Sequence, residues 1–293
     1  MGAKVSAVRP DFVGEISGID LCEELSQEEF AVVRSAVAEY GVVIVRDQHI
    51  NDEQQARFTR LFGALELPGA ASNITQNSDR RLGAEIADLS NLDKDGNLLV
   101  GDARQRMFNL GNRLWHSDSS FKPIPAQYSL LSARTVPAVG GDTQFADMSA
   151  AYDALSSAQH AELETLVCLH SLIFSRGLLG FDELSASELA NFKPVKQSLI
   201  RAHPLTGRKS LYLSAHAGEI VGWPTPEARV LLMELNEGAT HEQFVYAHHW
   251  RQHDLVIWDN QRTMHRARPF ADKSLVRDMH RTTVAGLAPT VEQ

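Results

Sequence analysis

The sequence predicts a mainly β fold with peripheral helices, arranged as an antiparallel sandwich or barrel. Three observations predict it. The last third of the 293-residue chain consists mostly of short strand-like runs rich in apolar residues. Helical patterns are few and lie around these runs. No internal repeat, low-complexity tract or linker divides the chain, so we expect one domain over residues 1–293.

Two helices and a strand are predicted near the N-terminus. Ser26 and Glu29 have the spacing of a capping box, and Gly41 follows the last apolar position, so a helix is expected between them. The run VVIVRD after Gly41 predicts a buried strand. A second helix follows, capped by Asn51 or Asp52.

The middle of the chain has weaker patterns. Residues 85–99 indicate a strand, an Asp-Gly turn and another strand, and residues 147–167 indicate one or two helices capped by Asp147 and Ser156. Residues 67–82 and 171–200 show no clear period. Long stretches without a period are often substrate loops, so we expect lid-like insertions there.

The last third is predicted to contain four strands and one helix. The strand-like stretches are SLYLSAHAG, QFVYAHHW, DLVIWD and VRDMHRTTVAG, and the helix is TPEARVLLMELNE.

Composition excludes several classes of protein. The formal net charge of -9 provides no broad basic surface for nucleic acid. The two cysteines, Cys22 and Cys168, lie in apolar settings without a C-x-x-C partner, which favours reduced thiols. The N-terminus lacks the apolar core of a signal peptide, and no run of eighteen apolar residues occurs. We therefore expect a cytoplasmic protein that binds neither membranes nor nucleic acid.

A possible metal site lies in the stretch NRLWHSD. If it is a strand, Asn112, His116 and Asp118 share one face, and the last two are about 7 Å apart at a rise of ~3.3 Å per residue. His265, just beyond the run DLVIWD, is the best third ligand. Two histidines and one carboxylate form the facial triad of non-haem Fe(II) oxygenases. A lone H-x-D is more often a structural pair or a surface hydrogen bond, so the motif alone decides nothing.

Two arginines also share a strand face in the predicted last strand. Arg277 and Arg281 project from the same side, where no acidic residue is expected. The planar fork of arginine binds carboxylates through two hydrogen bonds, so a dicarboxylate cosubstrate and an anionic substrate would explain the pair. The alternative is that they pair with core carboxylates or point to solvent.

Four motifs in this order resemble one enzyme family. They are WHSDSSF, GGDTQFADM, WDNQRTMHRA and RDMHRTTVAG. Together they resemble the taurine/2,4-dichlorophenoxyacetate dioxygenase family of Fe(II)- and 2-oxoglutarate-dependent oxygenases, over nearly the whole chain. FNLGNRLWHSDSSF and RKSLYLSAHAG are most similar to the 2,4-dichlorophenoxyacetate branch. The resemblance implies a distorted double-stranded β-helix, or jelly roll, with the iron between its two sheets.

The resemblance also implies roles for eight residues. The implied iron ligands are His116, Asp118 and His265; Thr143, Arg277 and Asn112 would bind 2-oxoglutarate; Arg281 and His216 would bind the substrate. His216 has an equally good interpretation as a core histidine with a backbone partner. Asp259 and Asn260 are expected to fix the turn before His265.

The implied reaction uses Fe(II), 2-oxoglutarate and O₂ to hydroxylate the carbon next to the carboxylate of an aryloxyacetate such as 2,4-dichlorophenoxyacetate. The products would be a phenol and glyoxylate, with succinate and CO₂ from 2-oxoglutarate. Another aryloxyalkanoate, an aromatic carboxylate, or an alkyl sulfate or sulfonate stays open, because Arg281 would bind any of these anions. The stretch AASNITQNSD lacks the His and Tyr of the taurine branch, which argues against taurine.

Two other classes of function also stay open. One is a non-catalytic binding protein on the same scaffold, and the other is a zinc hydrolase, which lacks an obvious general base here. Family members are commonly oligomeric, so a homo-oligomer is expected from the resemblance.

Overall fold

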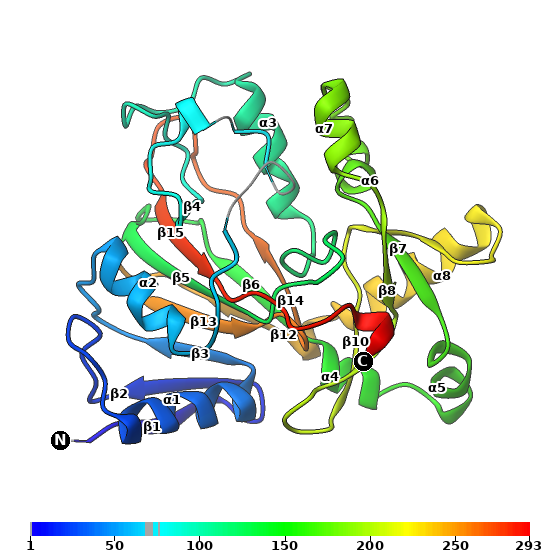
Figure 1. Cartoon of the computed structure of the whole chain (residues 1–293), viewed down its shortest axis with the longest axis horizontal. Coiled ribbons are helices and arrows are strands. Elements are labelled where there is room, and N and C mark those ends of the chain that lie inside the picture. The colour runs from blue at the N-terminus through cyan, green and yellow to red at the C-terminus, as the bar shows by residue number, and fades with distance from the viewer. Residues whose placement is uncertain (1, 68–72, 76) are drawn as a thin grey trace.

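The computed structural model of the chain describes residues 2–67, 73–75 and 77–293 (Figure 1). Its strands are β1 (Lys4–Arg9), β2 (Val13–Ser17), β3 (Val42–Val45), β4 (Ala87–Asp88), β5 (Tyr128–Thr135), β6 (Thr143–Asp147), β7 (Val167–His170), β8 (Val195–Ser198), β9 (Ile200–Ala202), β10 (Lys209–Leu211), β11 (Ala217–Ile220), β12 (Val245–His248), β13 (Leu255–Asp259), β14 (Thr263–Ala267) and β15 (Asp278–Thr283). Its α-helices are α1 (Gln27–Tyr40), α2 (Asp52–Arg60), α3 (Arg104–Asn109), α4 (Met148–Asp153), α5 (Ser157–Leu163), α6 (Leu172–Gly177), α7 (Ala186–Asn191) and α8 (Thr225–Ala239).

Two sheets form the centre of the molecule. The larger has the order β1-β2-β3-β13-β5-β15-β4, and the smaller has the order β12-β6-β14. All their pairings are antiparallel except that of β2 with β3. Phe145 of the smaller sheet packs with Leu131, Trp258 and Met279 of the larger one, which makes an apolar layer between the sheets. This arrangement is the predicted jelly roll.

Helices α1 and α2 cover the outer face of the larger sheet, as Figure 1 shows. Side chains alternate along β3, so Val43 and Val45 face these helices while Val42 and Ile44 face the layer between the sheets. Both predicted helices are confirmed. Ser26 and Glu29 form the capping box of α1, and α2 begins after Asn51.

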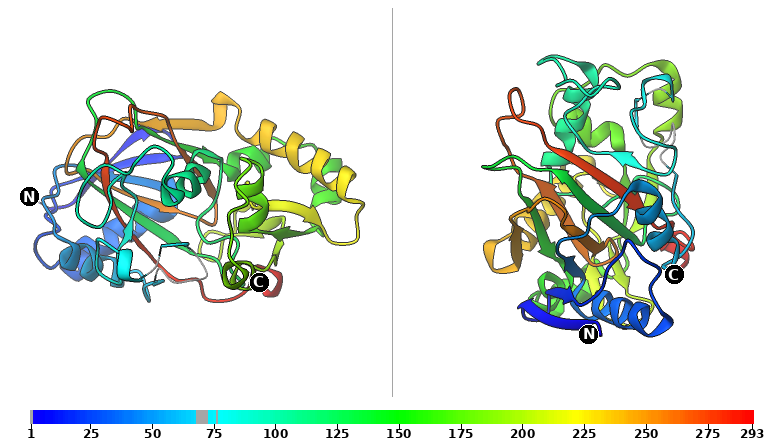
Figure 2. Two further views of the ribbon diagram at one scale, coloured as in Figure 1. Left: turned by 90° about the horizontal axis from the view of Figure 1, so that it is seen from above. Right: turned by 90° about the vertical axis from the view of Figure 1, so that its left-hand side faces the viewer.

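A third group of elements lies at the other end of the molecule from the N-terminal strands. It contains the sheet β11-β7-β8, the pair β10-β9 and the long helix α8, which Figure 2 shows from above. Leu199, Leu211 and Leu232 belong to its apolar core. The predicted pair of helices at 147–167 is confirmed as α4 and α5, with Asp147 and Ser156 as their N-caps.

Three strand predictions are wrong in part. In the stretch NRLWHSD, residues Leu110–Arg113 form a 3₁₀ turn and only His116 makes a β-bridge. Ser119 has a φ of 55°, so the chain turns directly after Asp118 instead of continuing as a strand. Residues 85–99 contain only β4 and a bridge of Leu92 with Leu98.

The third is SLYLSAHAG, which is divided between β10 and β11. The chain leaves β10 after Leu211, and the amide of Ala215 donates to the carbonyl of Trp115 at 2.7 Å. This contact ties the segment to the HSD stretch instead of to a neighbouring strand, because each buried amide must find a partner.

The two lid predictions fall on different kinds of structure. Within 67–82, residues 68–72 and 76 lie outside the described part, and Asn77–Asp79 form a 3₁₀ turn. Within 171–200, the structure has α6, α7 and β8. The role of either stretch as a lid stays a prediction.

Cys22 and Cys168 are both free thiols, and burial raises the pKa of Cys168 to about 12. Among the described residues, no helix combines the length and apolar character needed to span a bilayer.

Candidate active site

Three buried side chains converge between the two sheets. The ligand atoms of His116, Asp118 and His265 all lie within 4.8 Å of one another. Nε2 of His116 is 3.9 Å from Oδ1 of Asp118, and Nε2 of His265 is 3.8 Å from Oδ2. At these separations one ion could contact all three groups.

A β-bridge brings the two histidines together. The amide of His116 donates to the carbonyl of His265 at 3.0 Å, and the amide of His265 donates back at 2.8 Å. Nδ1 of His116 also donates to the carbonyl of Leu114 at 2.8 Å, because a carbonyl can only accept. This fixes the tautomer that leaves Nε2 of His116 as a free acceptor facing Asp118.

A set of hydrogen bonds orients Asp118. Its Oδ2 accepts from the Ser129 hydroxyl at 2.7 Å, and its amide donates to Oδ1 of Asn260 at 3.2 Å. The amide nitrogen of Asn260 donates to the same Ser129 hydroxyl at 2.9 Å. Oδ1 of Asp118 accepts from the Arg281 guanidinium. The expectation that no acidic residue faces Arg281 is therefore wrong, because the turn after Asp118 brings this carboxylate against β15.

The electrostatics suit a divalent transition metal. Burial lowers the pKa of both His116 and His265, so the imidazoles are neutral at pH 7. Burial by itself would raise the pKa of Asp118, but Arg281 and the two histidines hold it well below its usual value. Nδ1 of His265 is buried and has no hydrogen-bond partner among the described residues. Two neutral nitrogens and one carboxylate therefore fit an Fe(II) ion at this position.

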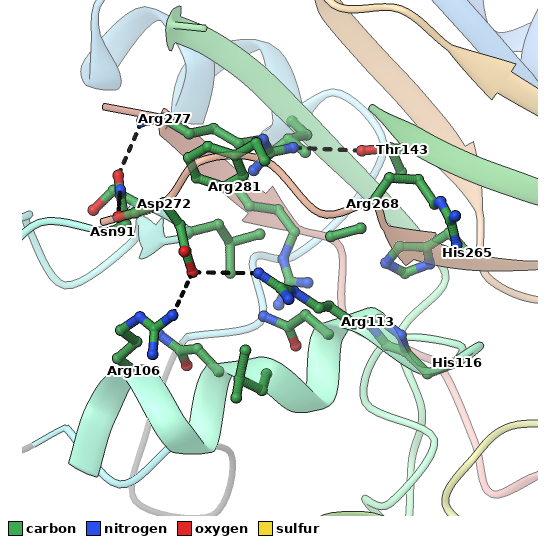
Figure 3. Close-up of a pocket in the computed structure, with 18 of the residues that line it drawn as sticks. Asn91, Arg106, Arg113, His116, Thr143, His265, Arg268, Asp272, Arg277 and Arg281 are labelled. Atoms are coloured by element: carbon green, nitrogen blue, oxygen red, sulfur yellow. Dashed lines mark hydrogen bonds and ion pairs between the residues drawn. The ribbon is translucent and has the colours of Figure 1, made fainter. Parts of the chain in front are cut away.

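The larger of two cavities beside this cluster is strongly cationic (Figure 3). It measures about 910 Å³, and we call it the arginine cavity. Its charged lining residues, other than the histidines, are Arg106, Arg113, Arg268, Arg277, Arg281 and Asp272. Asp272 accepts from Arg106 at 2.8 Å and from Arg113 at 3.3 Å. The excess of guanidinium groups favours an anionic ligand.

Arg277 lies at the inner wall of the arginine cavity. It donates to the carbonyl of Gly141 at 3.0 Å and to the Thr143 hydroxyl at 3.5 Å, a contact drawn in Figure 3. Trp250 donates to the same hydroxyl at 3.0 Å. Burial lowers the pKa of Arg277 to about 10, so it stays cationic at pH 7. It forms no ion pair with any described residue, so its charge is available to a ligand.

A second cavity lies against the other side of the cluster. It measures about 750 Å³ and is lined by Phe108, Phe121 and Leu172, so we call it the aromatic cavity. His116, Asp118, Asn112, Arg281, Arg176 and His216 also line it, as do Glu66 and Asp88, which form ion pairs with Lys122 and Arg81. Asn112 and Arg281 line both cavities and thus stand between them.

His216 is buried in the wall of the aromatic cavity. Its Nδ1 lies 2.8 Å from the Ser175 hydroxyl, and its ring is 4.8 Å from that of Phe121. The Ser175 hydroxyl is a side-chain partner, and a backbone hydrogen bond with Ser171 also acts on the pKa of this ring, as expected for a core histidine. Burial, together with the charge of Arg176, lowers the pKa of His216 well below its usual value.

A family comparison agrees with this arrangement. Residues 4–283 match the description "Taurine catabolism dioxygenase TauD, TfdA family". The chain belongs to this family. It is therefore an Fe(II)- and 2-oxoglutarate-dependent dioxygenase, as the sequence motifs implied.

Individual TauD/TfdA relatives cover nearly the whole chain. The chain is 42% identical to the alpha-ketoglutarate-dependent 2,4-dichlorophenoxyacetate dioxygenase of Cupriavidus pinatubonensis, over 97% of this chain and 98% of that protein. It is 36% identical to the (S)-phenoxypropionate/alpha-ketoglutarate-dioxygenase of Sphingobium herbicidovorans, over 94% and 92%. The solved structure of AAD-2 with Mn(II) and N-oxalylglycine superposes with a TM-score of 0.96 at 52% identity, over 99% of this chain and all of that one.

The structure brings all eight residues named from the sequence to the two cavities or the cluster between them. Sequence reasoning missed Ser129 and Arg176, and it assigned Asn260 only to a turn. Ser129 lies in an apolar strand, where a serine gives no signal. Arg176 lies in the stretch 171–200, where the hydrophobic residues show no helical or strand periodicity from which the orientation of its side chain could be predicted.

Proposed function

We propose that this TauD/TfdA dioxygenase hydroxylates the carbon between the carboxylate and the ether oxygen of an aryloxyacetate such as 2,4-dichlorophenoxyacetate. One observation carries the proposal: the cluster of His116, Asp118 and His265 lies between a cationic cavity suited to 2-oxoglutarate and an aromatic cavity suited to an aryl ring. The names of the two relatives above support this class of substrate.

His116, Asp118 and His265 would hold Fe(II) through two nitrogens and one oxygen. When bound, Fe(II) supplies the oxidising chemistry, in which O₂ is consumed, 2-oxoglutarate is decarboxylated to succinate and CO₂, and a substrate carbon is hydroxylated. The fixed tautomer of His116 and the hydrogen bond from Ser129 to Asp118 hold two of the donors in place without a metal, which lowers the reorganisation needed on binding.

The arginine cavity would take 2-oxoglutarate. Arg277 would donate two hydrogen bonds to the carboxylate far from the metal, with the Thr143 hydroxyl as a third donor. Trp250 already donates to the oxygen of Thr143, which orients the hydroxyl proton away from the indole. Asn112 would contact cosubstrate or substrate, because it lines both cavities.

The aromatic cavity would take the primary substrate. Arg281 would bind its carboxylate and His216 would contact it, while Phe108 and Phe121 enclose the ring. Hydroxylation of the carbon next to the carboxylate gives a hemiacetal. Its carbon–oxygen bond to the aryl group then breaks, the new hydroxyl loses its proton and becomes the aldehyde of glyoxylate, and the aryl oxygen leaves as the phenol.

A second candidate substrate is an aryloxypropionate. The relative at 36% identity is named for (S)-phenoxypropionate, which differs by one methyl group at the reacting carbon. The same residues would bind it. Hydroxylation would give a hemiketal, which breaks down to a phenol and pyruvate instead of glyoxylate.

We also propose that residues 1–293 act as one domain in which 67–82 and 171–200 close over the substrate. Asn73 and Leu172, one from each stretch, line the aromatic cavity. A cytoplasmic location and self-association are further proposals, which rest on the sequence and on the resemblance.

The test is turnover by the purified protein. It is loaded with Fe(II) and 2-oxoglutarate without air, and air is then admitted with or without 2,4-dichlorophenoxyacetate. We expect equal amounts of succinate and dichlorophenol, and almost no succinate when Fe(II) is omitted. Succinate that the aryloxyacetate does not increase would remove this substrate class.

A further inference from the structure

Arg176 is a buried cation without a counter-ion. It lies in the last turn of α6, with only 6% of its surface exposed. Its Nη1 donates to the Ser175 hydroxyl at 3.3 Å, and the guanidinium lies 4.4 Å from the centre of the Phe108 ring. No carboxylate pairs with it in the described part of the chain, and residues 68–72 and 76 contain no Asp or Glu.

This arrangement is unfavourable for the folded protein by itself. Burial lowers the pKa of Arg176 to about 10, so the side chain is still charged at pH 7. Its Nε is buried and has no hydrogen-bond partner among the described residues. Buried charges are normally paired, and an unpaired one destabilises the fold unless a ligand supplies the opposite charge.

Arg176 lines the aromatic cavity, close to the candidate metal ligands His116, Asp118 and His265. The cavity wall also contains His116, Asp118 and Arg281. Arg176 and His216 both contact the Ser175 hydroxyl, at 3.3 and 2.8 Å, and the ring of His216 is 6.2 Å from that of His116. It therefore faces the space in which the reacting part of a substrate would lie.

The surroundings fix the position of this guanidinium. The Phe108 ring packs against it, and Gly111 leaves room for it. A Cβ atom at position 111 would lie only 2.1 Å from Nη1 of Arg176. A glycine at this place lets the backbone approach the guanidinium closely. The group is thus held in place before any ligand binds.

The two cations of the aromatic cavity differ in one respect. Arg281 already forms an ion pair with Asp118, whereas Arg176 has no acidic partner in the described residues. Of these two cations, Arg176 is therefore the one that a ligand carboxylate would neutralise. We propose that Arg176 binds the carboxylate of the primary substrate, as a second anchor beside Arg281. This inference rests on the proposed function, since it takes the substrate to be an aryloxyacetate.

The experiment compares an acid with its neutral isostere. Calorimetry on protein loaded with Mn(II) and N-oxalylglycine gives the dissociation constants of phenoxyacetate and phenoxyacetamide. For the wild type we expect clear preference for the acid. In Arg176→Met the acid should bind at least tenfold more weakly, while the affinities for the amide and for N-oxalylglycine change little. Arg176→Lys should recover part of the preference, because it keeps the charge.

Arg201 offers a matched control. It is also 6% exposed and lies 4.8 Å from the centre of the Tyr212 ring, but it does not line the aromatic cavity. Arg201→Met should leave the preference for the acid unchanged. The melting temperature of ligand-free Arg176→Met should equal or exceed that of the wild type, because an unpaired buried charge has been removed.

Three outcomes would overturn the inference. In the first, the affinity of Arg176→Met for the acid stays within twofold of the wild type. In the second, its affinities for the acid and for the amide fall equally. In the third, it melts at a lower temperature than the wild type and still prefers the acid. If Arg176→Met does not fold, Arg176→Lys and Arg176→Gln carry the same comparison. A wild type that turns over aryloxyacetates but shows one of these outcomes overturns only the role of Arg176. A wild type that neither binds phenoxyacetate nor releases succinate with it overturns the proposed substrate as well.

Discussion

Arg281 donates a hydrogen bond to Oδ1 of Asp118, the carboxylate of the metal cluster. The same carboxylate accepts from the Ser129 hydroxyl through Oδ2. A cation on β15 and a hydroxyl on β5 thus hold the carboxylate in its ionised form, between the two histidines. Arg281 would therefore position a metal ligand in addition to contacting the substrate.

Replacing Arg281 tests both roles. In Arg281→Gln we expect kcat/KM for the aryloxyacetate to fall about 10- to 100-fold, since hydrogen bonds to charged groups contribute ~1.5–3 kcal/mol. The affinity for Mn(II), measured by calorimetry, should fall as well, because the carboxylate of Asp118 loses a hydrogen bond that orients it. Arg208→Gln, in an exposed pair with Asp153, is the control and should change neither value. An unchanged Mn(II) affinity would leave Arg281 with a role in substrate binding only.

Replacing Asp118 tests the metal site. Asp118→Asn keeps the size of the side chain but removes its negative charge, so we expect Mn(II) to stop raising the melting temperature and turnover to disappear. His265→Ala should behave in the same way. Asp153→Asn, at an exposed position outside both cavities, should keep the response to Mn(II). A normal Mn(II) response in both cluster variants would exclude these residues as ligands.

The two contacts proposed for 2-oxoglutarate can be distinguished by two substitutions. Thr143→Val removes one hydroxyl donor, so the KM for 2-oxoglutarate should rise about two- to tenfold, as expected for ~0.5–1.5 kcal/mol. Arg277→Gln removes a buried cation and should raise this KM more. Binding of N-oxalylglycine to the Mn(II)-loaded variants checks both expectations without turnover. Equal effects of the two substitutions would argue against a carboxylate on Arg277.

Much of this site could be predicted from the sequence, although one of the structural reasons was wrong. His116 and Asp118 were expected to converge because they alternate along a strand. The structure instead uses a single bridge to His265 and a turn at Ser119, where φ is 55°. A positive φ at a serine is imposed by tertiary contacts, and it has no clear signal in the sequence. The motif still predicted a metal site, because two imidazoles and one carboxylate can bind a metal whatever the backbone conformation that positions them.

The helices were predicted better than the surroundings of the site. The caps of α1 and α4 are local interactions within a few residues, so Ser26 and Asp147 could be identified directly. The partners of Asp118 come from distant parts of the chain. Ser129 is eleven residues away and Arg281 is 163 residues away, and no local pattern links such positions.

His280 of β15 lies between Arg277, which precedes the strand, and Arg281, and it makes the stability of the protein depend on pH. Burial would lower its pKa, but the ion pairs with Asp278 and Asp52, the second of which is also a hydrogen bond, raise it above the usual value. Arg81 and Arg134 are the cations next to these carboxylates. The folded state therefore binds the proton more tightly than the unfolded chain, in which the pKa of histidine is about 6.5.

This stabilisation is complete below about pH 6.5, the unfolded value, and it is lost as the pH rises through the raised value in the folded protein. We expect His280→Gln to lower the melting temperature more at pH 6 than at pH 9. His241→Gln, at an exposed histidine, should show no such difference between the two pH values. An equal loss at both pH values would mean that His280 stabilises the contact between β15 and α2 by packing, with no contribution from its proton.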